Sequence, residues 1–185
     1  MTEKEYELKM LLTNREYRFL LDMFNLLTVE TDLQTNYYYD TLDEIMRKKN
    51  VTIRVREKNG KLLGTVKRHL VNGDSLEEHF HVDTLPQVIM LEGTPVWLKG
   101  SLVTERKTLR VSDGITLMLD LNQYLNTVDY ELEIEYSEQL RDQAEGILML
   151  IRCLLARTQQ KGAISKSERF FQRLSNRGGS NYAQT

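Results

Sequence analysis

Cysteine is nearly absent from this chain of 185 residues, which contains only Cys153. A single cysteine excludes an internal disulfide and a cysteine-based zinc site, and it fits a reduced, intracellular setting. Long apolar runs are also missing, since no stretch approaches the ~20 residues of a membrane-spanning helix. The charged N-terminal sequence MTEKEYELKM lacks the apolar core of a signal peptide. We therefore expect a soluble, cytoplasmic protein that has no membrane partner.

A large net charge is missing as well. The 25 Lys and Arg residues nearly balance 27 Asp and Glu residues, which gives a net charge of -2. Such a chain has no general attraction for nucleic acid, so we expect no nucleic-acid partner and only a local basic site. The length suits one domain. We expect this domain to cover residues 1–176, followed by a disordered tail over residues 177–185.

Proline occurs only at Pro86 and Pro95, and we interpret residues 83–97 as an irregular connection. Elsewhere the dominant pattern is an alternation of polar and apolar residues with a period of two, which is typical of strands. The turn sequences Asn59-Gly60 and Asp113-Gly114 predict tight hairpins, so consecutive strands run antiparallel. The eight predicted strands cover residues 3–11, 28–41, 51–58, 61–70, 75–82, 101–111, 115–122 and 127–136.

Helical spacing is found between these strands and after them. Thr13 or Asn14 can cap a helix whose Tyr17, Leu20 and Leu21 share one face. Further helices are predicted over residues 43–49, 138–157 and 167–174. Apolar helix stripes and apolar strand faces can cover each other, so we expect the helices to pack on the outside of the sheet. The predicted fold class is α+β.

Charged residues share one face of each predicted strand. In the first strand Glu5, Glu7 and Lys9 alternate with Tyr6 and Leu8. Later strands repeat this division, with bases concentrated on some strands and acids on others. Carboxylates at alternate positions stand about 7 Å apart and repel each other unless cations lie among them. The charged faces of the later strands carry Arg54, Arg56, Lys67, Arg106, Arg110, Asp120, Glu131, Glu133 and Glu135.

This clustering favours a ligand site over an ordinary charged surface. An eight-stranded antiparallel barrel would hold the charged faces inside a tunnel and turn the apolar faces toward the helices. An open sheet with helices on one side and water on the other fits the same alternation. Carboxylates favour hard cations such as Mg²⁺ or Mn²⁺, whereas several Arg and Lys residues favour phosphate oxygens. The two sets together suit a metal-bound polyphosphate.

The order of the motifs resembles the CYTH superfamily, the triphosphate tunnel metalloenzymes. Residues 5–9, EYELK, match its ExExK signature, and YYYDT at residues 37–41 follows. Basic residues in RVR and TVK, the acidic run ELEIE and a late lysine complete a match over residues 3–169. The resemblance implies a tunnel of eight antiparallel strands and metal-dependent activity on small-molecule triphosphates. Thiamine triphosphatases, inorganic triphosphatases, fungal-type RNA triphosphatases and class IV adenylate cyclases share this family.

The resemblance also implies roles for individual residues. Glu5, Glu7 and Lys9 would be catalytic. The metal would be held by Glu5, Glu7, Asp120, Glu131, Glu133 and Glu135. The triphosphate would be bound by Lys9, Arg54, Arg56, Lys67, Arg106 and Lys166. The alternation of faces adds Arg110 to this set, and it favours Glu77 over Glu78 as a further tunnel acid because Glu78 shares its face with Phe80.

Several alternatives stay open at the level of sequence. The chain fits a hydrolase of inorganic triphosphate, thiamine triphosphate or a nucleoside triphosphate. A class IV-type adenylate cyclase and a non-catalytic binder of polyphosphate or nucleotide use the same residues. His69, His79 and His81 share a face and could hold zinc, although histidines beside a phosphate tunnel or at strand ends explain them equally well.

Overall fold

The structure is a computed structural model that describes residues 2–70, 74–157 and 164–178. Its main feature is one antiparallel sheet of ten strands. The strands are β1 Thr2–Glu5, β2 Glu7–Leu12, β3 Asp32–Asp40, β4 Val51–Lys58, β5 Lys61–His69, β6 Ser75–His81, β7 Val88–Leu91, β8 Thr94–Ser112, β9 Ile115–Tyr124 and β10 Thr127–Tyr136.

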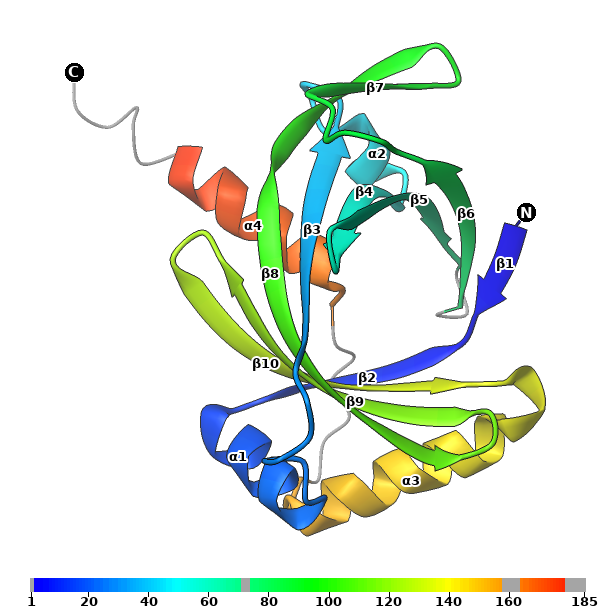
Figure 1. The fold of residues 1–185 in the computed structure, drawn as a ribbon, viewed down its shortest axis with the longest axis vertical. Helices are drawn as coiled ribbons and strands as arrows, with labels where there is room; N and C mark the ends of the chain where they lie inside the picture. The colour runs from blue at the N-terminus through cyan, green and yellow to red at the C-terminus, as the bar shows by residue number, and fades with distance from the viewer. Residues whose placement is uncertain (1, 71–73, 158–163, 179–185) are drawn as a thin grey trace.

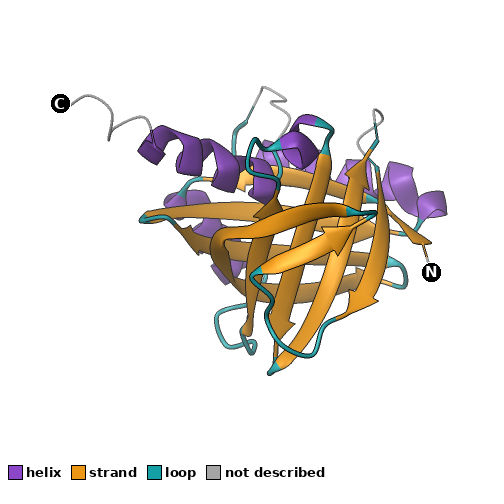
Figure 2. Ribbon diagram, turned by 90° about the horizontal axis from the view of Figure 1, so that it is seen from above, coloured by secondary structure: helices purple, strands orange, loops and turns teal. Residues whose placement is uncertain are grey.

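The sheet curls into a nearly closed barrel (Figures 1 and 2). Hydrogen-bonded neighbours follow the order β1-β6-β5-β4-β3-β8-β9-β10-β2, with β7 paired to β8 beside this path. Since β1 and β2 follow each other directly in the chain, the two ends of the path meet. The predicted antiparallel barrel is therefore confirmed.

The number of strands differs from the predicted eight for two reasons. The first predicted strand breaks at Tyr6, so that β1 pairs with β6 while β2 pairs with β10. Because of this break, the consecutive strands β1 and β2 pair with different partners and close the barrel between β6 and β10. The prediction of an irregular connection over residues 83–97 was wrong, because this stretch holds β7 and the start of β8. Glu92 and Gly93 form the turn between β7 and β8 with φ of 48° and 79°, close to the 52° and 71° of Asn59 and Gly60 in the β4–β5 hairpin.

Two helices pack on the outside of the barrel, as predicted. They are α1 Asn14–Met23 and α3 Arg141–Leu154, the latter preceded by the short 3-10 helix η1 Glu138–Leu140. Both cover the apolar face of β2, β9 and β10 (Figure 1). Leu20 of α1 and Ala144 of α3 are fully buried in this core. The outer face of these strands is therefore apolar, which leaves their charged face for the bore.

The last helix, α4 Lys166–Gly178, is placed differently. Its Phe170 is fully buried against Tyr38 and Tyr124, which come from the inner faces of β3 and β9. The first turn of α4 thus reaches into one end of the barrel rather than lying on its outside. The helix also continues through the predicted domain boundary at residue 176, and residues 179–185 lie outside the described part of the chain.

The remaining helix, α2 Ile45–Lys48, is shorter than predicted. Asp40 ends β3 and accepts hydrogen bonds from the backbone N–H groups of Met46 and Arg47, which fixes the start of this helix. Among the described residues, no helix has both the length and the apolar character that crossing a membrane requires.

Glu16 yields a prediction about acid stability. It completes a capping box with Thr13 and also binds Arg157 beyond α3. Burial alone would raise the pKa of Glu16, but hydrogen bonds from Arg157 and Thr13 lower the pKa to about 2. The stabilisation is therefore complete above the ordinary carboxyl range and is lost as the pH falls toward 2. We expect Glu16→Gln to cost about 1–2 kcal/mol of unfolding free energy at neutral pH and little near pH 2.

Urea unfolding across this pH range measures the effect, with Glu30→Gln on an exposed loop as the control. A loss that is the same at neutral pH and near pH 2 would contradict the assignment, because only the ionised carboxylate makes these contacts.

Candidate functional site

The bore contains one cavity that is lined almost entirely by polar side chains. Its lining comes from β1, β2, β3, β4, β5, β8 and β10, and the first turn of α4 closes one side. The space open to water in this cavity is about 60 Å³, room for only a few water molecules. A second cavity of about 280 Å³ shares Glu7, Lys9, Thr52 and His69 with it. The predicted site residues that line the first cavity are Glu5, Glu7, Lys9, Arg54, Arg56, Lys67, Arg106, Glu133, Glu135 and Lys166.

The alternation of the strands explains why these residues meet. In β2 and β10, Glu7 lies opposite Glu135 and Lys9 lies opposite Glu133. In the neighbouring pair, Arg106 of β8 lies opposite Asp120 of β9. Residues directly opposite in register place their side chains on the same face of a sheet. A closed sheet then turns all of these faces toward one axis.

Four predicted residues lie outside the lining of the cavity. Glu77, Asp120 and Glu131 are buried one step behind it, where they bind the cations that face the bore. Arg110 is instead exposed, with 73% of its side chain accessible, and it binds Asp113 at the end of the β8–β9 hairpin. Arg110 shares the face of Arg106 but stands past the enclosed part of the barrel. The structure therefore does not bring Arg110 to the site.

Lys67 is the centre of the first buried ion cluster. Its ammonium group binds Glu5 and lies 3.3 Å from carboxylate oxygens of both Glu7 and Glu77. Burial by itself would lower the pKa of Lys67, but the charges of Glu7 and Glu5 outweigh it and raise the pKa. Lys67 therefore stays charged and holds three acids from three strands together.

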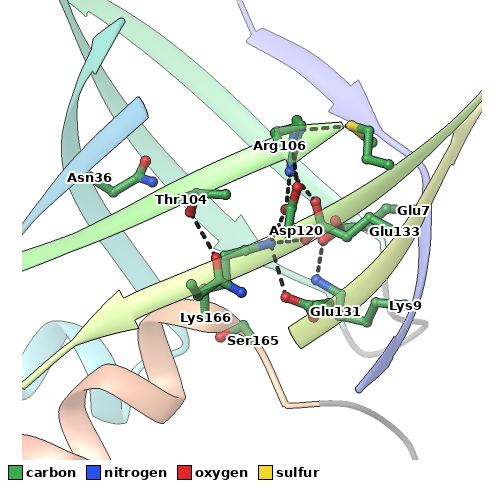
Figure 3. Close-up of polar contacts among 12 residues, drawn as sticks. Glu7, Lys9, Asn36, Thr104, Arg106, Asp120, Glu131, Glu133, Ser165 and Lys166 are labelled. Carbon is green, nitrogen blue, oxygen red and sulfur yellow. Dashed lines mark hydrogen bonds and ion pairs between the residues drawn. The ribbon is translucent and has the colours of Figure 1, made fainter. Parts of the chain in front are cut away.

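The second cluster joins Arg106 and Lys166 to three acids (Figure 3). The Arg106 guanidinium donates to Asp120 at 2.6 Å and to Glu133 at 2.5 Å. The Lys166 ammonium lies 2.8 Å from Asp120, 2.9 Å from Glu131 and 2.5 Å from Glu133. Both cations thus share Glu133 and Asp120. This sharing ties β8, β9 and β10 to the first turn of α4.

The acids of the bore differ in their protonation behaviour. Burial favours the neutral form of Glu7, but the charges of Lys9 and Lys67 dominate and lower its pKa to about 2. Glu133 behaves alike, because Lys166 and Arg106 outweigh burial and lower its pKa. The pKa of Glu135 is raised instead, by burial and by the carboxylates of Glu5, Glu133 and Glu7. Among these acids, Glu135 is therefore the one whose charge is least compensated by nearby cations.

Arg54 and Arg56 are short of negative charge. Arg56 donates to the amide oxygen of Asn36 at 2.9 Å, and among the described residues it has no carboxylate within ion-pair distance. Burial and the nearby charges of Arg54 and Arg106 lower the pKa of Arg56 to about 10. Arg54 reaches Glu77 only at 3.4 Å, and its buried Nε atom has no hydrogen-bond partner in the described structure. The guanidinium groups of Arg54 and Arg56 on β4 can therefore bind an anion.

Uncharged polar groups complete the site, and of these only His69 was considered from the sequence. A chain of hydrogen bonds links Ser165 to Ser167 at 3.0 Å, Ser167 to Thr52 at 2.9 Å and Thr52 to His69 at 3.2 Å. Burial and the charges of Lys67 and Lys9 lower the pKa of His69 to about 4, so its ring is neutral at neutral pH. Thr52 shares a strand face with Arg54, and His69 shares one with Lys67. The alternation of faces could therefore have predicted both residues.

Arg169 is the other residue that the sequence reading missed. It donates to both oxygens of Glu131, with the shorter bond at 2.9 Å, and to Asp129 at 2.9 Å. Arg169 lies in α4, where side chains do not alternate between two faces as they do in a strand, so the strand pattern could not predict its position. Its position behind Glu131 gives it a structural part in the second cluster.

The zinc alternative is not supported. His81 is 82% exposed and binds Asp83, and it pairs with Leu63 at the other end of the β5–β6 pair from His69. In the described ranges, no group of three or more His, Cys, Asp or Glu side chains is arranged to hold a metal ion. The acids of the bore converge on one cavity but are held apart by Lys67, Arg106 and Lys166. Tyr38 and Tyr39 are almost fully buried in apolar clusters, and Tyr38 also lines the cavity.

Comparisons with known proteins agree with this geometry. The profile described as CYTH domain matches residues 3–170. A Bacillus subtilis protein named "Putative triphosphatase YjbK" is 28% identical over 152 residues, which cover 74% of this chain and 79% of that protein.

Solved structures show the same fold. A structure from Bacillus halodurans, described as a "putative adenylate cyclase", has a TM-score of 0.76 at 23% identity and covers 92% of this chain and 98% of its own. The Hippeastrum protein HpAC1, described as a "putative adenylyl cyclase" with a dominant triphosphatase activity, has a TM-score of 0.69 at 20% identity. The shared part covers 93% of this chain and 96% of HpAC1. At this level of identity the likeness supports the fold alone.

Lys166 yields a prediction about the stability of the site. Removing its charge leaves three buried carboxylates with fewer cations, which is costly in a low-dielectric interior. We expect Lys166→Met to lower the unfolding free energy by about 3 kcal/mol at neutral pH. The loss should shrink in acid, because the lowered pKa of Glu133 means that this stabilisation is present at neutral pH and lost as the carboxylates become protonated.

Urea unfolding of the two proteins measures this difference. Lys61→Met, at an exposed position beside the β4–β5 turn, is the matched control and should change little. A Lys166 variant that is as stable as the control would show that the second cluster does not hold α4 in place.

Proposed function

The chain belongs to the CYTH domain family, whose profile matches residues 3–170, and from this membership we propose that it is a divalent-metal-dependent triphosphatase. It hydrolyses a phosphoanhydride bond of a small triphosphate that is bound in the barrel cavity. Inorganic triphosphate, thiamine triphosphate and nucleoside triphosphates are the proposed substrates. The proposed cofactor is Mg²⁺ or Mn²⁺, and the relative named as a triphosphatase supports this activity class.

The observation that carries the proposal is the imbalance of charge between opposite walls of the cavity. On β4, Arg54 has a buried guanidinium nitrogen without a partner, and Arg56 binds only a neutral amide among the described groups. On β10, Glu135 has no cation within ion-pair distance among the described residues, although the charge of Arg106 acts on it. A buried charge without a counter-charge costs several kcal/mol. A ligand that brings anionic oxygens to one wall and a cation to the other removes both costs.

The chemistry of the acids fits a divalent metal. Glu5, Glu7, Glu133 and Glu135 all line the cavity and offer carboxylate oxygens, the donors that Mg²⁺ and Mn²⁺ prefer. Asp120 and Glu131 are fully buried behind them, so we propose that these two position Arg106 and Lys166 instead of binding the metal. Binding would require Lys67, Arg106 and Lys166 to exchange carboxylates for phosphate oxygens, which frees the acids.

The roles of the residues in hydrolysis follow from their charges. When bound, the metal would neutralise charge on the phosphoryl oxygens and help to orient the attacking water. Arg54 and Arg56 would bind non-bridging oxygens, since guanidinium groups match phosphate geometry. Glu7, with a pKa of about 2, is ionised at neutral pH and can accept a hydrogen bond from the water.

The bond changes are those of a phosphoanhydride hydrolysis. The water oxygen bonds to the terminal phosphorus while the bond from that phosphorus to its bridging oxygen breaks. The electron pair leaves with the diphosphate product, and the proton of the water is released. Lys9 lies 2.6 Å from Glu7 and can stabilise the negative charge that grows on the leaving oxygen.

The direct test measures phosphate release from inorganic triphosphate, thiamine triphosphate and ATP, with Mg²⁺, Mn²⁺ or EDTA present. Cyclic AMP is measured in the ATP samples. We expect phosphate release that requires a metal and is restored when metal is returned after EDTA. Cyclic AMP as the main product would favour a cyclase, and binding of triphosphate without any turnover would favour a non-catalytic binder.

Glu7 and Lys9 provide the first variant test. We expect Glu7→Gln and Lys9→Ala each to lower kcat roughly 100-fold or more, because each removes a charge beside the reacting phosphate. Circular dichroism and urea unfolding should show that both variants are folded. Turnover at the level of the unmodified protein in either variant would refute the assigned site.

Arg106 and Arg110 form a matched pair on one strand and one face. Arg106 lies inside the barrel and binds Asp120 and Glu133, whereas Arg110 is exposed. We expect Arg106→Ala to lower kcat/KM roughly 100-fold, while Arg110→Ala keeps kcat/KM within about twofold. Steady-state kinetics with inorganic triphosphate compares them. Equal losses in the two variants would mean that the substrate extends beyond the enclosed cavity.

A further inference from the structure

Helix α3 carries a second apolar stripe that faces away from the barrel. Its Ala144, Leu148 and Ile151 form the buried face. Leu150 and Met149 on the other side are 67% and 66% exposed. A helix of a soluble protein usually has a single apolar stripe toward its core. A contiguous exposed apolar surface of this kind is typical of an interaction site.

The exposed stripe continues into a groove beside the helix. Leu150 and Leu154 form one wall of this groove, and Leu109 and Val111 of β8 form the other. Its volume is about 430 Å³. In Figure 1, α3 runs along the outside of the molecule, with the sheet on one side and no described element on the other. The groove therefore extends the apolar surface from the helix onto the barrel wall.

The charges along α3 indicate what covers this surface. Glu145 lies in the N-terminal half and Arg152 in the C-terminal half, seven residues apart and thus on the same flank of the helix. When two copies of one helix pack antiparallel, the same flank of each faces the other, so acid meets base. Antiparallel packing also opposes the two helix dipoles favourably. This surface is complementary to itself.

We propose that the protein forms a symmetric homodimer through antiparallel packing of α3 against α3 of a second copy. The two-fold axis passes near Met149, midway between Glu145 and Cys153, so that Met149 and Leu150 of the two copies pack together. Glu145 faces the Arg152 of the second copy. Gly146 faces Cys153 of the second copy, and a side chain at Gly146 would meet no atom within 4 Å in the single chain. The missing side chain lets the two helices approach closely.

Sedimentation velocity at a series of concentrations tests the dimer. We expect the unmodified protein to dimerise and Leu150→Glu to weaken dimerisation roughly 100-fold, because one leucine is lost from each copy. Leu42→Glu is the matched control, since Leu42 is 75% exposed elsewhere on the surface. A protein that stays monomeric at about 100 μM, or a Leu42 variant as impaired as the Leu150 variant, overturns the proposal. A monomer would leave this face to another protein.

Crosslinking and charge exchange test the register. Gly146→Cys should form disulfides with Cys153 of the second copy under mild oxidation, whereas the unmodified protein, which has only Cys153, should not. Glu145→Arg should weaken the dimer, and adding Arg152→Glu should restore it. A dimer that neither crosslinks nor responds to the charge exchange overturns the antiparallel arrangement. None of these measurements depends on catalysis, so they stand apart from the proposed triphosphatase activity.

Discussion

Charges of opposite sign that are buried together in the bore are the constraint on which this structure depends. Moving one ion out of water costs several kcal/mol, and pairing offsets this cost only when the geometry is good. Asp120 and Glu131 are fully buried, yet Lys166 lies within 3 Å of both. Each central cation serves at least two carboxylates, so that no strand holds its charge alone. For this reason the fold of the barrel and the electrostatics of the cavity depend on the same ion pairs.

Neutralisation is complete behind the cavity and incomplete at its surface. Asp120 and Glu131 are saturated by Arg106, Lys166 and Arg169, which makes them suited to hold those cations. Arg54 binds Glu77 but keeps a buried Nε atom without a hydrogen-bond partner, and Arg56 and Glu135 have no ion-pair partner among the described residues. A fully paired interior would have no reason to take a ligand. The graded pairing therefore separates residues that build the site from residues that are free to bind.

The alternation along each strand predicted which residues face the bore, because side chains in a strand alternate strictly between two faces. It could not predict how far each strand stays enclosed. Arg106 and Arg110 have the same parity, but only Arg106 lies within the closed part of the barrel. The stripe of α4 likewise predicted a helix without showing which surface it covers, so the place of Phe170 among inward-facing tyrosines was not foreseen. Both outcomes depend on how the barrel closes between residues that are far apart in the chain. The local sequence pattern gives no information about that closure.

The placement of α4 explains how a residue so late in the chain enters the cavity. Phe170 is buried against Tyr38 and Tyr124, and Glu168 binds Arg47 of α2 through both of its oxygens at 2.7 and 2.8 Å. These contacts fix the helix on two sides, so that Lys166 at its start points toward Asp120, Glu131 and Glu133. Without that anchoring, a flexible lysine would lose much of its entropy each time it paired. The apolar end of the barrel thus serves the polar site by holding its last cation in place.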